Sequence, residues 1–544
     1  MPKLLKEYPI LTICLLVALM LLPHLDAIQV SIMEARNFIT AREMVLNDNW
    51  LLTTMNGEPR YQKPPLPTWL TAFSGLLFGI ESIFGMRLPA VLLVMVIGCF
   101  MYKLSRSILK SRGHALINAF IVVTSFYVIG IIIEAPWDIF THGFMLVAIY
   151  HLHKLFKAEG TVWKHTIIAG FFIGLSLLSK GPVSFYALLL PFLIAYAFSL
   201  KYKNAKAKVF SFFSVLIIAL IAGGWWYVFV RLNDPTTFNA ITEKETGNWT
   251  SYNVRPFYYY WSFFTQSGLW TIPAFISLLY PYLKTRVSNY KAYKFSLLWT
   301  IFAVVLLSII PEKKSRYLMP VLIPLAFNIG FYIEYLIRRF KDLKDKRETL
   351  PVYFNFGLIG TIAIAFPIVF YSLFTSELHH HWLPFIVASI ILVTLGMFIL
   401  YKLKQKNIKH VFLLTVLFFT SVFAVGLPLM ELFKSDTFRS IASLKEDNEK
   451  RGITLYSFKY VAPETIWQYG NMIPQIQYHN NEFQFPLESK FGVLTNRIST
   501  EDLSLLKAKF NVKEVSTYNL NQAKEGTKQY NDRLTNTFYI LSKK

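Results

Sequence analysis

The chain has 544 residues, of which 54% are hydrophobic and 16% charged, and its formal net charge is +23. Repeated apolar runs of about 20 residues are what a helix needs to cross a hydrocarbon layer of roughly 30 Å, so the composition predicts a mostly α-helical, polytopic membrane protein rather than a soluble one. The two cysteines, Cys14 and Cys99, both lie within apolar runs and indicate neither a disulfide framework nor a metal cluster.

Lys and Arg are concentrated in alternate gaps between the apolar runs, for example in 103–112, 284–294 and 338–347. The gaps between these basic loops are acidic, mixed or nearly uncharged. Such alternation is typical of membrane proteins, whose cytoplasmic loops carry an excess of Lys and Arg. The positive charge therefore reflects topology and contact with the lipid bilayer, and it does not predict nucleic-acid binding.

The same alternation predicts about 13 membrane spans, with a cytoplasmic N-terminus and an outer C-terminus. No small-residue cleavage site follows the first apolar run, so we expect an uncleaved span there rather than a signal peptide. The spans form a domain over 1–430, and we expect its long outer loop, 27–85, to carry the chemistry. The predicted spans are 9–26, 86–105, 114–133, 137–153, 165–180, 182–200, 209–230, 263–283, 295–311, 317–337, 353–375, 382–401 and 410–430.

The first outer loop contains the segment EARNFITAREM, which begins at Glu34 near the predicted exit of the first span. As a helix, this segment places Glu34, Phe38 and Arg42 on one face, because residues four apart are neighbours. A carboxylate near the membrane surface is partly desolvated, which suits it to accept a proton in catalysis. The alternative is a salt bridge between Glu34 and a neighbouring Arg that orders the loop. Arg42 is a candidate contact to a sugar or an acceptor.

The later run YQKPPLPTW contains Lys63 as its only cation, in a path that three prolines stiffen. A rigid Lys beside the lipid headgroups is a good phosphate ligand. The equally weighted alternative is a side chain that snorkels towards those headgroups. Tyr61, two residues earlier, is a second candidate contact to sugar or acceptor.

Further candidates lie at the outer ends of later spans. Glu134 and Asp138 are one helical turn apart around an outer gap, where carboxylates tend to be functional, although Asp138 also suits a helix N-terminus. Cations precede two predicted spans, at Lys180 before 182–200 and in the 311–317 turn before 317–337. They indicate either a phosphate site or general contact with anionic lipid. The candidate phosphate ligands are Lys180, Arg255, Lys313, Lys314, Arg316 and Tyr317. The 231–262 loop adds Trp249 and Tyr258, either as sugar contacts or as part of an interfacial aromatic belt.

Residues 431–544 are polar and differ in character from the rest of the chain. Alternating stretches at 453–460 and 491–495 predict strands, and helical patterns lie near 463–470 and 501–509. We therefore expect a small soluble α/β domain on the outer face. The chain has no Walker motif and no GxGxxG, which argues against an ATP-driven pump and a soluble nucleotide-sugar enzyme.

Four motifs occur in the order EARNFITAREM, NGEPRYQKPPLPTW, SKGP and KKSRYLMP. Together they resemble the polyprenyl-phosphate-sugar-dependent glycosyltransferases of the C-type fold, and within that class the aminoarabinose transferases that modify lipid A and the protein mannosyltransferases. The resemblance implies that Glu34 is a catalytic carboxylate, that Lys63 binds the lipid phosphate and that Glu134 is a second acid. The chain departs from the family pattern at Met33, Gln62 and Glu134, where the family often has Asp, Glu and Asp. The loss of acids at Met33 and Gln62 argues against a divalent metal at those two positions, and the departures mean that the acceptor need not be lipid A. A divalent metal elsewhere is possible, and no metal ligand is assigned.

The resemblance implies transfer of a sugar from undecaprenyl phosphate to lipid A, another glycan or a protein, with inversion at the anomeric carbon. It also implies a multi-pass protein of the bacterial inner membrane, with the N-terminus cytoplasmic and the C-terminus periplasmic. The alternative is a lipid or polysaccharide transporter or flippase, which should show paired halves or broken helices near mid-membrane. A non-catalytic scaffold is a third hypothesis, but it leaves the Glu34 and Lys63 loop unexplained.

Overall fold

The structure is a computed structural model that describes residues 5, 7–158, 162–200, 202, 208–375, 377–479, 482–496 and 498–544. It divides into two compact units, a mostly helical one and one that mixes helices and strands. The helical unit consists of Met1–Asp26, Tyr61–Leu70 and Arg87–Pro428. The mixed unit consists of Ala27–Arg60, Thr71–Met86 and Leu429–Lys544, so most of the first predicted outer loop shares a unit with the tail.

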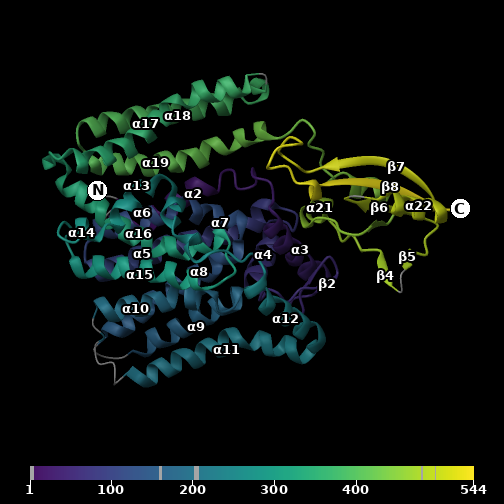
Figure 1. The fold of residues 1–544 in the computed structure, drawn as a ribbon, viewed down its shortest axis with the longest axis horizontal. Coiled ribbons are helices and arrows are strands. Elements are labelled where there is room, and N and C mark those ends of the chain that lie inside the picture. Colours follow the sequence, from purple (N-terminus) through teal and green to yellow (C-terminus); the bar gives the residue numbers. More distant parts are fainter. Residues whose placement is uncertain are drawn as a thin grey trace. The chain divides into compact units, whose positions relative to one another are not determined.

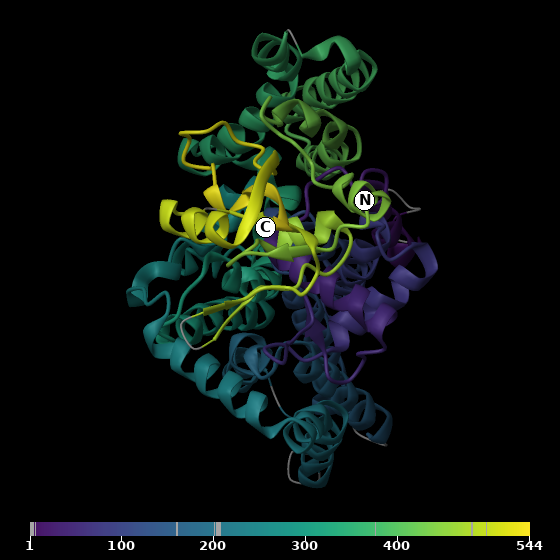
Figure 2. The same cartoon turned by 90° about the vertical axis from the view of Figure 1, so that its right-hand side faces the viewer.

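The helical unit contains most of the helices, and every predicted span falls on one or more of them. Its helices α17 (Lys346–Phe374), α18 (Trp382–Lys404) and α19 (Ile408–Gly426) lie side by side in both views of the ribbon (Figures 1 and 2). Two helices, α4 (Leu66–Phe78) and α5 (Ile83–Leu109), include residues of both units. The other helices of this unit are α2 (Pro9–Leu21), α6 (Arg112–Val123), α7 (Phe126–Glu134), α8 (Pro136–Lys157), α9 (Trp163–Lys180), η1 (Phe185–Leu189), α10 (Leu190–Ser199), α11 (Val209–Asn233), α12 (Pro235–Ser251), η3 (Phe257–Tyr260), η4 (Phe263–Trp270), α13 (Thr271–Leu278), α14 (Tyr280–Leu283), α15 (Tyr290–Ile309), η5 (Ser315–Leu318), α16 (Met319–Arg339), η6 (Phe340–Asp342), α17 (Lys346–Phe374), η7 (Leu378–His380), α18 (Trp382–Lys404) and α19 (Ile408–Gly426).

Among the described residues, seven helices are long and apolar enough to cross a membrane, and α6 and α7 together make an eighth candidate that is bent by 41°. By length and composition, seven or eight of the described helices are able to cross a membrane on their own, which is fewer than the 13 predicted spans. The remaining predicted spans fall on helices that are shorter, broken or more polar. An example is α8, which contains Asp138 and His142. The seven are Ile83–Leu109, Val209–Asn233, Tyr290–Ile309, Ser315–Asp342, Lys346–Phe374, Trp382–Lys404 and Ile408–Phe433.

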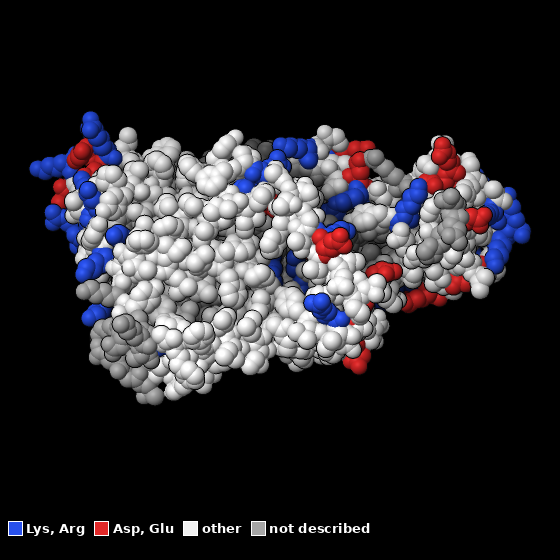
Figure 3. All heavy atoms as spheres, turned by 60° about the horizontal axis from the view of Figure 1, so that its bottom comes forward, with Lys and Arg blue, Asp and Glu red and all other residues white. Residues whose placement is uncertain are grey.

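The surface of the helical unit fits a lipid environment. On the face that Figure 3 views, a broad area of this unit carries no Lys, Arg, Asp or Glu, and Lys and Arg gather at one end of it. Large apolar side chains such as Leu232, Ile368 and Leu383 are more than 70% exposed on its helices. Exposure of this kind along whole helices is expected where the solvent is lipid rather than water.

Two helices of this unit, α9 and α11, approach each other closely at glycines. A Cβ added at Gly223 would lie 2.3 Å from the carbonyl oxygen of Gly174, and one added at Gly174 would lie 2.6 Å from the Cβ of Ala222. Small residues allow this approach, and packing between helices supplies much of their association in a membrane. The neighbouring Gly224 has no atom within 4 Å of an added Cβ.

We expect Gly223→Ala to destabilise the protein by about 1–3 kcal/mol, since the methyl group must push two helix backbones apart. Thermal unfolding of the purified protein in detergent measures this as a lower Tm. The matched control is Gly224→Ala, which adds the same methyl group one residue away in open space. Equal Tm values for the two variants would contradict the packing described here.

The mixed unit combines the first-loop helix α3 (Ile32–Asn47) with the tail. Its large sheet has the strand order β3-β6-β8-β7, in which β3 is parallel to β6 and the other two pairs are antiparallel. The predicted strands at 453–460 and 491–495 and helices near 463–470 and 501–509 are confirmed as β3, β6, α21 and α22. The elements are β1 (Thr54–Met55), β2 (Glu58–Pro59), η8 (Leu427–Phe433, which begins in the helical unit), α20 (Leu444–Lys450), β3 (Leu455–Ser457), α21 (Pro463–Tyr469), β4 (Gln477–His479), β5 (Glu482–Gln484), β6 (Lys490–Thr495), α22 (Thr500–Lys509), β7 (Phe510–Asn519), η9 (Asp532–Leu534) and β8 (Thr535–Lys543).

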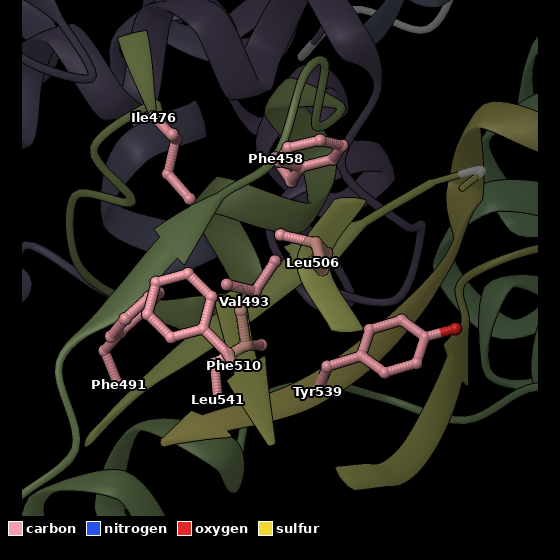
Figure 4. Close-up of a cluster of buried hydrophobic side chains, with 8 residues drawn as sticks. All are labelled: Phe458, Ile476, Phe491, Val493, Leu506, Phe510, Tyr539 and Leu541. Carbon is pink, nitrogen blue, oxygen red and sulfur yellow. The ribbon is translucent and has the colours of Figure 1, made fainter. Parts of the chain in front are cut away.

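A hydrophobic core lies on one face of this sheet (Figure 4). Alternate residues of the strands, such as Phe491 and Val493 of β6 and Tyr539 and Leu541 of β8, point to the same face, as the two-residue period of a strand requires. Leu506 of α22 packs onto them and is fully buried. The tail therefore has a core of its own.

Candidate active site

Glu34 lies in the first turn of α3 and is fully buried. Ser31 caps this helix: its side chain accepts a hydrogen bond from the Glu34 N–H, and the Glu34 Oε2 accepts one from the Ser31 N–H at 3.0 Å. This reciprocal pair is a capping box, which satisfies two amide donors that the helix itself leaves without partners. Glu34 is thus held at a fixed place at the start of α3.

Arg42, a predicted sugar or acceptor contact, lies on the same stripe of α3 but has protein partners. Its guanidinium donates hydrogen bonds of 3.3 Å to the carbonyl oxygens of Ile466, Trp467 and Asn471, and only 2% of the residue is exposed. Burial lowers the pKa of Arg42, against the opposing effect of Glu43. The Arg42 N–H groups, which were predicted to contact a sugar or an acceptor, are therefore hydrogen-bonded to carbonyl oxygens of the tail.

The Lys63 segment belongs to the helical unit, where Lys63 itself is half-buried. Near it, the Tyr61 hydroxyl donates to Asp234 Oδ2 at 3.1 Å. Burial, and then the bond to this carboxylate, raise the pKa of Tyr61 to about 12. Desolvation favours the neutral form of Asp234, but hydrogen bonds from Thr237 and Tyr61 outweigh it and lower the pKa. Asp234 was not among the predicted site residues, although an Asp before Pro235 is a recognisable helix cap.

Asp138 and Lys180 were predicted in different roles, and the structure pairs them with each other. The Lys180 Nζ is bonded to Asp138 Oδ1, and 9% of the Lys180 side chain and 2% of the Asp138 side chain are exposed. The Lys180 Nζ also lies 5.0 Å from the centre of the Tyr317 ring. A buried pair of this kind holds the ends of α8 and α9 together, because neither charge is stable alone in an apolar interior.

The predicted cationic turn at 311–317 contains three cations with different surroundings. Lys313 is 3% exposed, its Nζ donates to the carbonyl oxygens of Arg255, Ile310 and Pro311, and desolvation lowers its pKa. Lys314 forms an ion pair with Glu312 at 2.6 Å. In the part of the chain that the structure describes, the guanidinium of Arg316 forms no hydrogen bond or ion pair; it stands 5.9 Å from the Tyr317 ring centre.

The 231–262 loop runs beside this turn. Val254 and Glu312 form an antiparallel bridge, and the Arg255 N–H donates to the Pro311 carbonyl at 3.2 Å. The Arg255 side chain is exposed and, within the described ranges, has no hydrogen-bond or ion-pair partner. Trp249 and Tyr258 are 50% and 68% exposed, which is compatible with either prediction made for them.

Glu134 lies at the end of α7 and accepts a hydrogen bond from Tyr127 of the same helix. Arg316 is within electrostatic reach of Tyr127 and of Lys180. The helical unit thus gathers carboxylates, cations and aromatic hydroxyl groups around Arg316. Over the described ranges, no group of three or more His, Cys, Asp or Glu side chains is placed to hold a metal ion.

Comparison with known proteins decides the fold. The chain aligns over 99% of its length with the crystal structure of ArnT from Cupriavidus metallidurans bound to undecaprenyl phosphate, with a TM-score of 0.62 and 14% sequence identity. The apo form of that protein aligns over the same share with a TM-score of 0.64. The chain has the ArnT fold. This agreement covers 97% of the ArnT chain and includes the tail.

Sequence comparison points in the same direction as the ArnT fold. Residues 62–227 match the family model described as dolichyl-phosphate-mannose-protein mannosyltransferase. The undecaprenyl phosphate-alpha-4-amino-4-deoxy-L-arabinose arabinosyl transferase 1 of Proteus mirabilis is 28% identical over 63% of this chain, and a protein of that name without the number, from Shewanella sediminis, is 23% identical over 65%. The alignments span less than two thirds of these relatives, 61% and 65%. The resemblance that the four motifs predicted is confirmed.

Proposed function

We propose that this ArnT-like chain transfers one sugar from a polyprenyl phosphate carrier to an acceptor of the cell envelope. The observation that carries the proposal is the ArnT fold over 99% of the chain, joined to relatives named as undecaprenyl phosphate-dependent arabinosyl transferases. The donor is undecaprenyl phosphate carrying one sugar, and the acceptor is lipid A, another glycan or a protein.

The reaction displaces the lipid phosphate from the anomeric carbon, with inversion there. Arg316 and Arg255, whose guanidinium groups form no hydrogen bond or ion pair in the described ranges, and Lys63 stabilise the charge that develops on the leaving phosphate. Glu34 either removes a proton from an acceptor hydroxyl or orients the sugar. Lys313, bound to three carbonyl oxygens, holds the turn that carries Arg316.

The same proposal sets the protein in the bacterial inner membrane with the reaction on the periplasmic side. About 13 spans, with the N-terminus in the cytoplasm and the tail domain in the periplasm, place the outer loops on one side. Helices that do not meet the length or hydropathy needed for an independent span, such as the largely buried α8, then cross the membrane among the longer ones.

Mass spectrometry of envelope molecules from a deletion strain tests this function and identifies the acceptor. We expect one class among lipid A, envelope glycans and glycoproteins to lose the mass of a single sugar. Complementation with the wild-type gene should restore that mass, whereas complementation with Glu34→Gln should not. Unchanged masses in all three classes would contradict the proposal.

A further inference from the structure

Arg42 of α3 and the tail residues that bind it are more than 400 residues apart in sequence, yet α3 and the tail pack together within the mixed unit. The three carbonyl oxygens that bind Arg42 lie in the last turn of α21 and just beyond it. Carbonyls at a helix C-terminus have no partner within the helix and carry partial negative charge, so a cation there is well placed. Arg42 of α3 therefore caps a helix of the tail.

An aromatic contact reinforces this cap. The Trp467 ring centre lies 5.5 Å from the Arg42 Cζ and 5.2 Å from the Phe38 ring centre, in an edge-to-face arrangement. Phe38 is 1% exposed and Trp467 6% exposed. Glu34, Phe38 and Arg42 lie on one face of α3 because they are spaced four residues apart. The face of α3 that begins with Glu34 is therefore the face that contacts α21.

A second attachment fixes the far end of α3. Asn56 exchanges two hydrogen bonds of 2.8 Å with the backbone of Ile473 in the tail. Glu43 of α3 in turn accepts hydrogen bonds from the Asn56 N–H and the Thr54 hydroxyl, both at 2.6 Å. The helix is thus joined to the tail directly through Arg42 and indirectly through the β1–β2 hairpin, which restricts both rotation and sliding of α3.

We propose that tail residues 466–473 position α3, and that Arg42 and Trp467 are positioning residues which hold Glu34 in place for sugar transfer. This inference rests on the proposed function. The cations assigned to the donor phosphate lie on other segments, so loosening α3 acts on turnover and leaves donor binding unchanged. Displacing a catalytic group by about 1 Å costs on the order of 100-fold in rate.

The test compares Trp467→Ala with Trp467→Phe, which keeps an aromatic ring between Phe38 and Arg42, and with Leu487→Ala at a tail position that is 94% exposed. Steady-state kinetics with undecaprenyl phosphate-linked sugar give kcat and KM, and hydrogen–deuterium exchange reports on the amides of α3. We expect Trp467→Ala to lower kcat at least 10-fold with KM for the donor within twofold, and to speed exchange in α3. Trp467→Phe should recover most of kcat, and Leu487→Ala should match the wild type.

An unchanged kcat for Trp467→Ala would overturn the positioning role, as would a raised KM at constant kcat. If Trp467→Ala does not fold, Arg42→Lys makes the same test, since Lys keeps the charge but not the planar fork that reaches three carbonyls. An inactive wild type defeats the proposed function instead, whereas an active wild type with unaltered variants defeats only the positioning role.

Discussion

We expect Arg316→Ala to weaken binding of undecaprenyl phosphate roughly 30-fold, because a charge-assisted hydrogen bond to phosphate contributes about 2 kcal/mol. The reason is that the three cations of the 311–317 turn differ in their partners. Lys313 and Lys314 are bound to carbonyl oxygens and to Glu312, whereas the Arg316 guanidinium has neither hydrogen bond nor ion pair among the described residues. A planar guanidinium can also donate two parallel hydrogen bonds to two phosphate oxygens.

Binding of undecaprenyl phosphate to the purified protein, measured by microscale thermophoresis in detergent, gives the affinity. Arg347→Ala is the matched control, since it removes an exposed Arg from the start of α17 and should leave the affinity unchanged. Arg316→Lys should fall between wild type and Arg316→Ala, because it keeps the charge and loses the fork. An Arg316→Ala variant that binds as tightly as wild type would remove Arg316 from the phosphate site.

Asp138→Asn should lower the free energy of unfolding by about 3–5 kcal/mol, since it leaves the buried ammonium of Lys180 without its counter-charge. The pair is almost fully enclosed, so water does not replace the lost carboxylate. The measurement is the Tm of the purified protein in detergent, which is independent of any catalytic role of either residue.

The double variant Asp138→Leu with Lys180→Met is the control for this interpretation. It removes both charges and fills similar volume, and such replacements of buried pairs are often neutral or stabilising. We therefore expect it to regain most of the Tm that Asp138→Asn loses. A double variant that melts below Asp138→Asn would show that the pair itself is not the source of the stability.

Much of the fold was predictable from local sequence patterns, but two strands of the tail, β7 and β8, were not. β6 was predicted because residues 491–495 were read as an alternating stretch. β8 was missed: as a strand with neighbours on both sides and apolar residues on both faces, it lacks the clean alternation of a half-exposed strand. β7 was missed for the opposite reason, since this edge strand is mostly polar and half of its ten residues are exposed.

For the candidate site, the sequence predicted which residues share a helix face but not which groups their side chains contact. The four-residue spacing correctly put Phe38 and Arg42 on one face of a helix, where both contact Trp467. The partners of Arg42 and Lys313 are backbone carbonyls, which every residue has and no sequence motif marks. The Asp138–Lys180 pair joins two helix ends that only the tertiary fold brings together.

In the proposed reaction a sugar leaves its lipid phosphate and joins an acceptor. The most direct measurement uses purified protein in liposomes with radiolabelled undecaprenyl phosphate-linked sugar and lipid A, glycan and peptide acceptors. We predict that label appears on one acceptor class mole for mole with released undecaprenyl phosphate. The opposite result would be label that crosses the bilayer still attached to its lipid, with no transfer, as a flippase produces.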